Sequence, residues 1–486
     1  MKSFALLLVV GFTLVYGQFD PHWRAGRSVM VHLFEWKWND IANECETFLG
    51  PRGYAGVQIS PPAENVIIRT PSRPWWERYQ PVSYSLNTRS GNEATFADMT
   101  RRCNAVGVRI YVDLLLNHMS ATTGTGTGGT IVSTPRNFPA VPYVDADFNP
   151  TCSIDWGSAT SVRNCELVGL PDLDQSRSNV RQHLINYMNR LIDLGVAGFR
   201  QDALKHMWPA DLQVMFSQLH NLNTNHGFAA NSRAYMVGEV IDNGNEPISG
   251  TEYFGFSTIT EFRYSNAISN SFRGNDQLRW LRNFGEAWGF HPSNRVLTFV
   301  ENHDNERGGA LSYKSARQYK MAVAFHLAWN YGIPRIMSSF AFEGHDMGPP
   351  MDANENLLSP LFDAAGACTN GWICQHRWRQ IFHMVEWRNV VGTGAVANWW
   401  DNANNRIAFS RGSRGFIAFN GESSNMSEWL TTGLPAGVYC DVISGEKSGT
   451  TCTGKSIQVF EDSRALFSIA TTDFDGVIAI HVDARL

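Results

Sequence analysis

Three acidic residues, each in a distinctive local sequence, are the side chains of this chain best suited to chemistry. Asp202 lies in Gly-Phe-Arg-Gln-Asp, Glu239 in Met-Val-Gly-Glu-Val and Asp304 in Glu-Asn-His-Asp-Asn. Each follows a short apolar run that predicts a buried β-strand. One acid at a strand end is often only a helix cap, so no single motif decides the matter. Together they suggest glycosidic bond cleavage, which needs a nucleophile, a protonated acid and charge that stabilises an oxocarbenium-like transition state.

These acids converge only if their strands lie side by side in one sheet or barrel. Eight apolar runs resemble parallel strands covered on both faces: Ser28–Trp36, Tyr54–Ser60, Val108–Leu116, Val196–Asp202, Ala234–Val240, Ile259–Phe262, Val296–Val300 and Pro334–Phe340. Helical patterns lie between many of them, at Glu93–Ala105, Asn179–Leu194, Pro209–Leu222, Ala316–Trp329 and Gln375–Arg388. This alternation predicts an α/β fold, a (β/α)₈ TIM barrel, with chemistry at the carboxyl ends of its strands.

The alternation fails in two places, which predicts two further domains. Residues 117–173 are rich in Gly, Thr, Pro and Asn and predict a small domain inserted after the third strand. Residues 395–486 contain short alternating strands and predict an antiparallel Greek-key β-sandwich. The barrel would then consist of residues 18–116 and 174–394.

Composition and the N-terminus indicate a secreted globular protein. Residues 1–17 have a basic start, an apolar stretch and a small-residue end, which is typical of a signal peptide. A net charge of −5 gives no reason to expect nucleic acid or an acidic membrane as partner. No later apolar run is long enough to span a bilayer, so we expect an extracellular protein.

The eight cysteines would enter an oxidising compartment and could pair. Closeness in sequence suggests the pairs Cys152–Cys165, Cys368–Cys374 and Cys440–Cys452, which leaves Cys45–Cys103. Sequence alone permits roughly a hundred other pairings.

Four stretches extend the three acid motifs into a family resemblance. They are Val-His-Leu-Phe-Glu-Trp-Lys-Trp (31–38), Pro-Trp-Trp-Glu-Arg-Tyr-Gln-Pro (74–81), Asn-Ala-Val-Gly-Val-Arg (104–109) and His-Arg-Trp-Arg-Gln-Ile (376–381). With them, essentially the whole mature chain resembles the animal α-amylases, insect members in particular. The resemblance implies a monomeric, retaining endo-hydrolase of α-1,4-glucans, acting on starch, glycogen and maltooligosaccharides and secreted into the digestive tract. It implies that Asp202 is the nucleophile, Glu239 the general acid/base and Asp304 the transition-state stabiliser.

The resemblance also implies a set of substrate-binding residues. Trp75, Trp76 and Tyr79 would form a stacking platform, and a Pro-Trp-Trp loop is a poor helix or strand, which argues against a purely structural role. The spacing of His118, His206 and His303 matches no zinc signature. In the family the first and last donate hydrogen bonds to sugar. The remaining cleft residues are Gln80, Lys205 and Ile241.

Two ion sites follow from the same resemblance. Asn117, the Arg163 carbonyl, Asp172 and the His206 carbonyl match calcium ligands, and all are the oxygen donors that a hard cation requires. Without the resemblance, Asn117 and Asp172 read as turn and capping residues. Arg200, Asn302 and Arg335 match a chloride site. Two guanidinium groups would favour the ionised form of Glu239, and a bound anion would offset them and leave it protonated. On its strand, Arg200 also lies on the same face as Asp202 and would keep that nucleophile ionised.

Three departures from the family pattern qualify the expected site. Residue 201 is Gln where relatives usually have an aliphatic residue, and residue 238 is Gly where they usually have Gln. We hypothesise that Gln201 compensates for Gly238 on the neighbouring strand. After Arg307 the chain has only Gly308-Gly309 before Ala310 and Leu311, where typical members have a longer mobile glycine-rich loop. The amylase-related paralogues of flies share this shortening, which would affect substrate hold or release.

Two alternatives remain beside the amylase interpretation. One is another enzyme of the same clan, such as a maltase or α-glucosidase, against which the predicted sandwich and chloride residues argue. The other is a non-catalytic carbohydrate-binding relative, which would be expected to lack at least one of the three acids.

Overall fold

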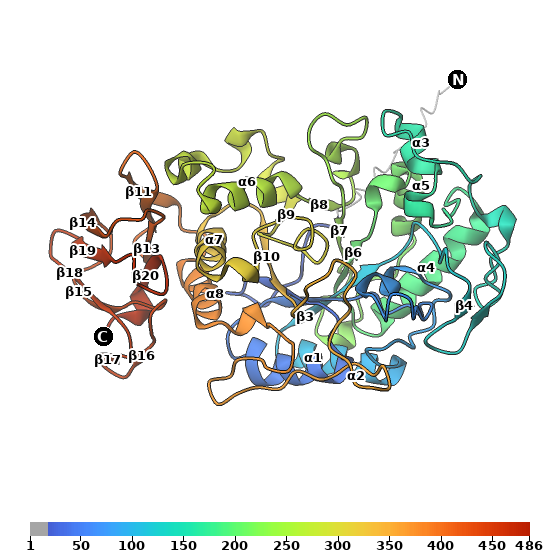
Figure 1. The fold of residues 1–486 in the computed structure, drawn as a ribbon, viewed down its shortest axis with the longest axis horizontal. Coiled ribbons are helices and arrows are strands. Elements are labelled where there is room, and N and C mark those ends of the chain that lie inside the picture. The colour runs from blue at the N-terminus through green and yellow to red at the C-terminus, as the bar shows by residue number, and fades with distance from the viewer. Residues whose placement is uncertain (1–17) are drawn as a thin grey trace, which may run out of the picture.

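The computed structural model describes residues 18–486 (Figure 1). The predicted signal peptide, residues 1–17, lies outside the described residues. In Figure 1 a barrel occupies the centre, the C-terminal strands lie at the left and the segment around β4 and α3 lies at the right.

Eight parallel strands close into a barrel in the order β1-β10-β9-β8-β7-β6-β3-β2. Their bounds are β1 Met30–Leu33, β2 Gly56–Ile59, β3 Arg109–Leu114, β6 Gly198–Gln201, β7 Tyr235–Gly238, β8 Thr258–Thr260, β9 Val296–Thr298 and β10 Ile333–Ser338. The first strand closes the barrel against the last, with Met30 opposite Arg335. All carboxyl ends therefore meet at one rim, and the predicted barrel is confirmed.

Helices cover the outside of the barrel because each presents an apolar stripe to the strands. Their bounds are α1 Trp38–Glu44, α2 Glu93–Ala105, α4 Ser178–Asp193, α5 Pro209–Ser217, α6 Phe262–Arg273, α7 Ala316–Ala328 and α8 Arg379–Val391. Asn92 caps α2, where it accepts a hydrogen bond from the backbone N–H of Thr95. The predicted helix at Gln375–Arg388 is instead a 3₁₀ turn, Gln375–Arg377, followed by α8.

The segment between β3 and α4 contains little regular structure. It has two short strands, β4 Gly124–Thr125 and β5 Ile131–Val132, one short α-helix, α3 Ala159–Asn164, and two 3₁₀ turns, Asp145–Asp147 and Leu167–Gly169. Its ends are tied to the barrel through the backbone, since Leu173 N–H donates to Asn117 O at 2.8 Å. The segment is thus a long excursion that returns to the strand end from which it left.

The C-terminal strands are antiparallel, as predicted. One sheet has the order β11-β12-β13-β20, and the pairs β14-β19, β15-β18 and β16-β17 complete the domain. The bounds are β11 Val396–Asp401, β12 Arg406–Arg411, β13 Gly415–Asn420, β14 Met426–Thr431, β15 Gly437–Cys440, β16 Lys447–Ser448, β17 Thr451–Cys452, β18 Ser456–Val459, β19 Arg464–Ile469 and β20 Val477–His481. The indole of Trp387 on α8 donates to Ile480 O at 2.9 Å and so links this domain to the barrel.

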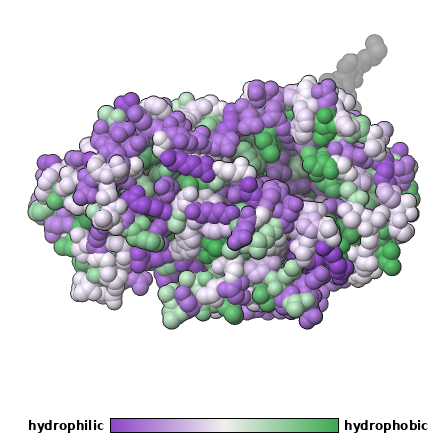
Figure 2. Space-filling model, viewed as in Figure 1, coloured by the Kyte–Doolittle hydropathy of each residue, from purple (hydrophilic) through white to green (hydrophobic). Residues whose placement is uncertain are grey.

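All four suggested disulfides are formed: Cys45–Cys103, Cys152–Cys165, Cys368–Cys374 and Cys440–Cys452. Within residues 18–486, none of the helices is long and apolar enough to cross a membrane. On the face shown in Figure 2, hydrophobic residues are scattered among hydrophilic ones, which is usual for a folded domain surface.

Candidate active site

The three predicted acids meet in one cleft at the carboxyl rim of the barrel. Asp202 directly follows β6, Glu239 directly follows β7, and Asp304 lies in the loop after β9. All three line a cavity of about 800 Å³. Parallel strands bring their carboxyl ends to the same edge, so residues about a hundred positions apart in sequence become neighbours.

Arg200 joins the two acids that follow β6 and β7. Its Nη1 donates to Oδ1 of Asp202 at 2.7 Å and to Oδ1 of Asp113 at 2.6 Å. Its Nη2 lies 2.7 Å from Oε1 of Glu239. The other carboxylate oxygen of Glu239 accepts the Ala203 N–H at 3.0 Å. One buried guanidinium group therefore holds three carboxylates in a fixed arrangement.

Burial opposes the ionisation of Asp202, Asp113 and Asp304. It raises the pKa of Asp202 to about 6, although the adjacent Arg200 acts in the other direction. The same balance of burial against Arg200 raises the pKa of Asp113 to about 6. Burial, and after it the Glu239 carboxylate, raises the pKa of Asp304, although 44% of its side chain remains open to the cleft. Despite Arg200, the Asp202 carboxyl would therefore be mostly ionised only above about pH 6.

Aromatic rings form one wall of the cleft. Tyr79 stacks on His303, with ring centroids 5.2 Å apart and planes 4° apart, and donates its hydroxyl to Asp113 at 2.9 Å. Trp75 contacts both rings edge-on and is almost fully buried, whereas Trp76 is half-buried. Of the two indoles, Trp76 is thus the one with a face available for stacking against a sugar ring.

The other predicted substrate contacts also line the cavity, but several are already engaged. Nε2 of His118 lies 2.9 Å from the Tyr79 carbonyl oxygen, so the donor on that atom is used within the protein. Gln80 Oε1 accepts the N–H groups of Ala121 and Thr122 at 3.1 and 3.2 Å and so holds the start of the excursion. Lys205 donates to Ile241 O at 2.8 Å and pairs with Glu246.

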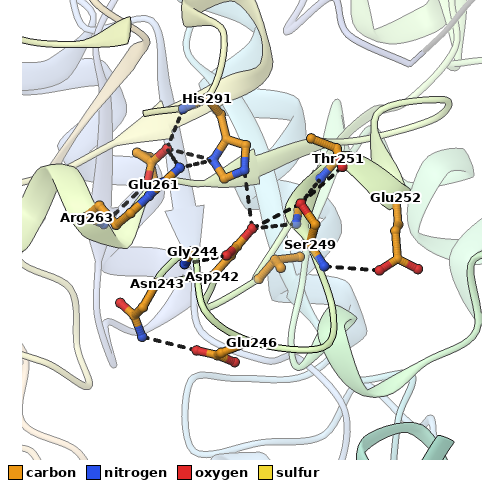
Figure 3. A network of polar contacts seen from close by, with 12 residues as sticks. Asp242, Asn243, Gly244, Glu246, Ser249, Thr251, Glu252, Glu261, Arg263 and His291 are labelled. Atoms are coloured by element: carbon orange, nitrogen blue, oxygen red, sulfur yellow. Dashed lines mark hydrogen bonds and ion pairs between the residues drawn. The ribbon is translucent and has the colours of Figure 1, made fainter. Parts of the chain in front are cut away.

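A polar network fixes the segment that follows Glu239 (Figure 3). Asp242 accepts the N–H groups of Gly244 and Gly250, both at 2.8 Å, and lies 3.4 Å from Nε2 of His291. Nδ1 of His291 lies 2.7 Å from Glu261, which caps α6. The network anchors this rim of the cleft, including Ile241 and Glu246, to the next strand and helix.

Oxygen atoms from three separate segments converge where the excursion meets the barrel. Oδ1 of Asn117 lies 3.0 Å from the His206 carbonyl oxygen and 3.3 Å from Oδ1 of Asp172. These oxygens repel one another unless a hydrogen-bond donor or a cation lies among them. A 180° rotation of the Asn117 amide would place its NH₂ group there as a donor. A bound cation would stabilise the oxygens without that rotation. Burial raises the pKa of Asp172 to about 8, so its ionised form is disfavoured in these surroundings. Arg163 lies in α3, which packs on the turn Leu204–His206.

Arg335 is a second buried guanidinium, but its surroundings differ from those of Arg200. It donates to the neutral amide oxygen of Gln58 at 2.5 Å, and among residues 18–486 no carboxylate lies within ion-pairing distance of it. The amide nitrogen Nε2 of Gln58 is also buried, and it has no hydrogen-bond partner among the described residues. Asn302 uses its side-chain oxygen to accept the N–H of Asp304 at 3.1 Å and that of Asn305 at 2.8 Å. Arg335 therefore brings a second buried positive charge into electrostatic reach of Asp113 and Glu239.

Comparison with known proteins agrees with this geometry. Residues 162–348 match the family described as "Alpha amylase, catalytic domain", and residues 397–483 match "Alpha amylase, C-terminal all-beta domain". The "Alpha-amylase-related protein" of Drosophila pseudoobscura pseudoobscura is 57% identical over 492 residues, which cover 100% of this chain and 99% of the relative. The protein of the same name from Drosophila melanogaster is 56% identical over 495 residues, with 100% of both chains covered. The chain belongs to the α-amylase family.

Solved structures of α-amylases have the same fold. The crystal structure of wild-type α-amylase I from Eisenia fetida matches with a TM-score of 0.90 and 43% identity, over 95% of this chain and 98% of that chain. A variant of that enzyme, solved as a maltohexaose complex, also matches with a TM-score of 0.90, at 42% identity over 94% of this chain and 98% of that chain. The barrel and C-terminal domain described above are therefore those of an α-amylase fold.

One sequence-based hypothesis about this α-amylase-family site is wrong. Gln201 lies opposite Gly238 in the strand register, but its amide donates to Phe199 O at 3.1 Å and lies 2.8 Å from the Met236 sulfur. It does not fill the space beside Gly238, because the side chain of Leu204 occupies that space. Register alone could not distinguish these arrangements.

Several residues of the site were not predicted. Asp113 lies within β3, is fully buried and accepts a hydrogen bond from Arg200. The signal that could have found it is an acid inside the largely apolar run Val108–Leu116. Trp156, Leu167 and Val168 come from the excursion, which carries no periodic pattern, so nothing in the sequence placed them at the cleft. They add apolar side chains to the lining of the cavity.

Proposed function

We propose that the protein is an α-amylase that hydrolyses internal α-1,4-glucosidic linkages in starch, glycogen and related glucans with retention of configuration. The observation that carries the proposal is the convergence of Asp202, Glu239 and Asp304 in one cleft, two of them bridged by Arg200. Because one guanidinium group touches both bridged carboxylates, they lie close together. Retaining enzymes have their two carboxyl groups roughly 5–5.5 Å apart, and inverting ones roughly 6.5–9.5 Å.

In this proposal each acid has one role. Asp202 attacks the anomeric carbon and forms a glycosyl–enzyme ester. Glu239 first protonates the leaving oxygen and then takes a proton from the water that hydrolyses the ester. Asp304, half-open to the cleft, accepts hydrogen bonds from sugar hydroxyls and stabilises the distorted ring. Trp76 and Tyr79 supply aromatic surface along the chain of sugar units.

Two ions belong to the proposal. The oxygen cluster of Asn117, Asp172 and the His206 carbonyl fits Ca²⁺, with the Arg163 carbonyl as a further ligand. Such an ion would clamp the excursion to the barrel. Arg335, Arg200 and Asn302 would hold Cl⁻, since within residues 18–486 the side-chain partner of Arg335 is the neutral amide of Gln58 and not a carboxylate. Negative charge there would compete with Glu239 for Arg200 and favour a protonated Glu239.

We also propose that residues 1–17 direct secretion and that the mature protein is a monomer. The experiment that tests the central proposal is product analysis on soluble starch with the purified mature chain. Rapid loss of iodine staining with release of mixed maltooligosaccharides of α configuration is expected. Release of glucose alone would instead favour an α-glucosidase. Binding of maltohexaose without hydrolysis would favour a non-catalytic relative.

A further inference from the structure

The turn between Asp202 and the next helix holds Glu239 at two points. Ala203 has a left-handed backbone (φ +50°), and its N–H donates to Oε2 of Glu239 at 3.0 Å. Two residues later, the Lys205 N–H donates to the backbone carbonyl of Glu239 at 3.3 Å. The carboxylate and the main chain of Glu239 thus both depend on where this turn lies.

Between those two hydrogen bonds, the side chain of Leu204 packs into a notch beside Gly238. A Cβ atom at position 238 would lie 1.8 Å from Cδ2 of Leu204, 2.9 Å from its Cγ and 3.0 Å from its Cβ. Leu204 is fully buried. Because the whole isobutyl group is close, no side chain at position 238 can coexist with Leu204 where it now lies.

The requirement for glycine at 238 is therefore one of space. Its φ is not in the left-handed region, and it pairs regularly with Gln201 in the barrel wall. A glycine inside a strand costs stability relative to a residue with a side chain unless another group uses the space. Leu204 uses it.

We propose that Leu204 is a positioning residue for the acid/base, acting as a knob that fits the Gly238 notch and so fixes the turn Ala203–His206 against Glu239. The inference deepens the proposed function and rests on it for the role of Glu239. The same turn presents Lys205 to the cleft and carries His206, whose carbonyl belongs to the oxygen cluster. One packing contact thereby fixes the positions of Glu239, Lys205 and the His206 carbonyl.

The test is a double-mutant cycle of Leu204→Ala, Gly238→Ala and the double variant, with Leu204→Met as the conservative change. Leu191→Ala, which removes an equally buried leucine from α4 away from the cleft, is the matched control. For each protein, kcat and KM on maltoheptaose and the midpoint of thermal unfolding are measured.

We expect Gly238→Ala to lower kcat at least tenfold in the wild-type background and less than threefold in the Leu204→Ala background, because the obstructing side chain is then absent. Leu204→Ala should lower kcat at least tenfold with KM changed less than threefold. Leu204→Met should retain most of kcat, and Leu191→Ala should lower the unfolding midpoint without changing kcat. Additive effects of the two alanine changes, or a kcat loss for Leu191→Ala as large as for Leu204→Ala, would overturn the proposal.

An inactive wild type would end the proposed function, and with it the role of Leu204 in positioning the acid/base. The unfolding midpoints would still test whether Leu204 packs against Gly238. A smaller midpoint loss for Gly238→Ala in the Leu204→Ala background than in the wild type supports the knob-and-notch contact. Equal losses in both backgrounds refute it.

Discussion

Buried Arg200 and partly buried Glu239 form an ion pair in which Nη2 of the guanidinium lies 2.7 Å from Oε1 of the carboxylate. Nη1 of the same group donates to Asp202. Because both acids contact Arg200, a change in the charge of one acid changes the stability of the ionised form of the other. A retaining glycosidase needs opposite protonation states in this pair, an ionised nucleophile and a protonated acid. The charges around Arg200 therefore decide the working pH of the proposed enzyme.

Glu239→Gln should abolish most hydrolysis while leaving binding intact. The substitution keeps the shape of the side chain and its contact with the Ala203 N–H but removes the transferable proton, so kcat should fall by about 10²–10⁴-fold. Release of reducing ends from starch measures the loss, and maltohexaose binding by calorimetry checks the cleft. Glu286→Gln, a change at an exposed glutamate outside the cavity, is the control and should keep full activity.

Activity should fall on the acid side as pH drops through about 6. Asp202 attacks only when ionised, and burial raises its pKa to about 6, so its ionised fraction and kcat/KM should decline about tenfold per pH unit below that value. Asp113 shares Arg200 and titrates in the same range, so the measured pKa belongs to the pair. Initial rates between pH 4.5 and 8.5 test this. A flat profile down to pH 5 would contradict the assignment of Asp202.

The sequence predicts the barrel well because its strands are buried on both faces and read as nearly continuous apolar runs. It is less reliable at element ends. The run Ile259–Phe262 is interrupted because the Glu261 side chain accepts the Arg263 N–H and starts α6, so the strand ends at Thr260. Capping of this kind depends on a side-chain geometry that an apolar pattern does not contain.

Site residues at strand ends were also predictable, since Asp202, Glu239 and Asp304 each follow an apolar run. Contacts between elements were not. Nothing in the sequence distinguishes Leu204 from other leucines. Its packing against Gly238 forms only after β6 and β7 pair and the turn Ala203–His206 folds back over them. The incorrect hypothesis about Gln201 has the same origin, because register shows which residues are opposite but not which side chain fills the space.

Chloride should raise the activity through Arg335. Its buried guanidinium has a neutral partner, Gln58, and burial lowers its pKa only to about 10, so it stays charged at neutral pH. We expect wild-type kcat to rise at least severalfold when chloride is added to a chloride-free buffer. Arg335→Gln should make the rate independent of chloride, whereas Arg335→Lys, which keeps the charge, should retain some dependence. A chloride response that survives Arg335→Gln would place the anion elsewhere.

Removal of calcium should destabilise the protein. A chelator should lower the unfolding midpoint by several degrees because ion binding to the folded state contributes directly to stability. Asp172→Asn should reduce this chelator effect, since it removes the charged ligand of the oxygen cluster. Asp174→Asn changes an acid two residues away that accepts hydrogen bonds from Ser176, and it should leave the effect unchanged. Equal chelator effects in all three proteins would rule out the proposed cluster.

Trp76→Ala should weaken substrate binding more than catalysis. Trp76 is half-buried and its indole donates to Asp346 at 3.1 Å, which holds the ring at the rim of the cleft without covering it. Loss of a stacking surface should raise KM for longer oligosaccharides about tenfold, equivalent to about 1.4 kcal/mol, with kcat within about threefold. Asp346→Ala should produce a smaller rise, because the ring remains but is no longer fixed.

Trp75→Ala should mainly destabilise the fold, in contrast to Trp76→Ala, which should mainly weaken substrate binding. Trp75 is 6% exposed, packs against Tyr79 and His303, and donates to His345 O at 2.9 Å. Its removal should cost about 3–5 kcal/mol of folding free energy, as for other buried large aromatics. Michaelis constants and unfolding midpoints of the two variants should therefore separate, with Trp76→Ala changing KM and Trp75→Ala changing the midpoint. If Trp76→Ala destabilises the protein as much as Trp75→Ala, then Trp76 is part of the core and the stacking platform must be assigned to Tyr79 alone.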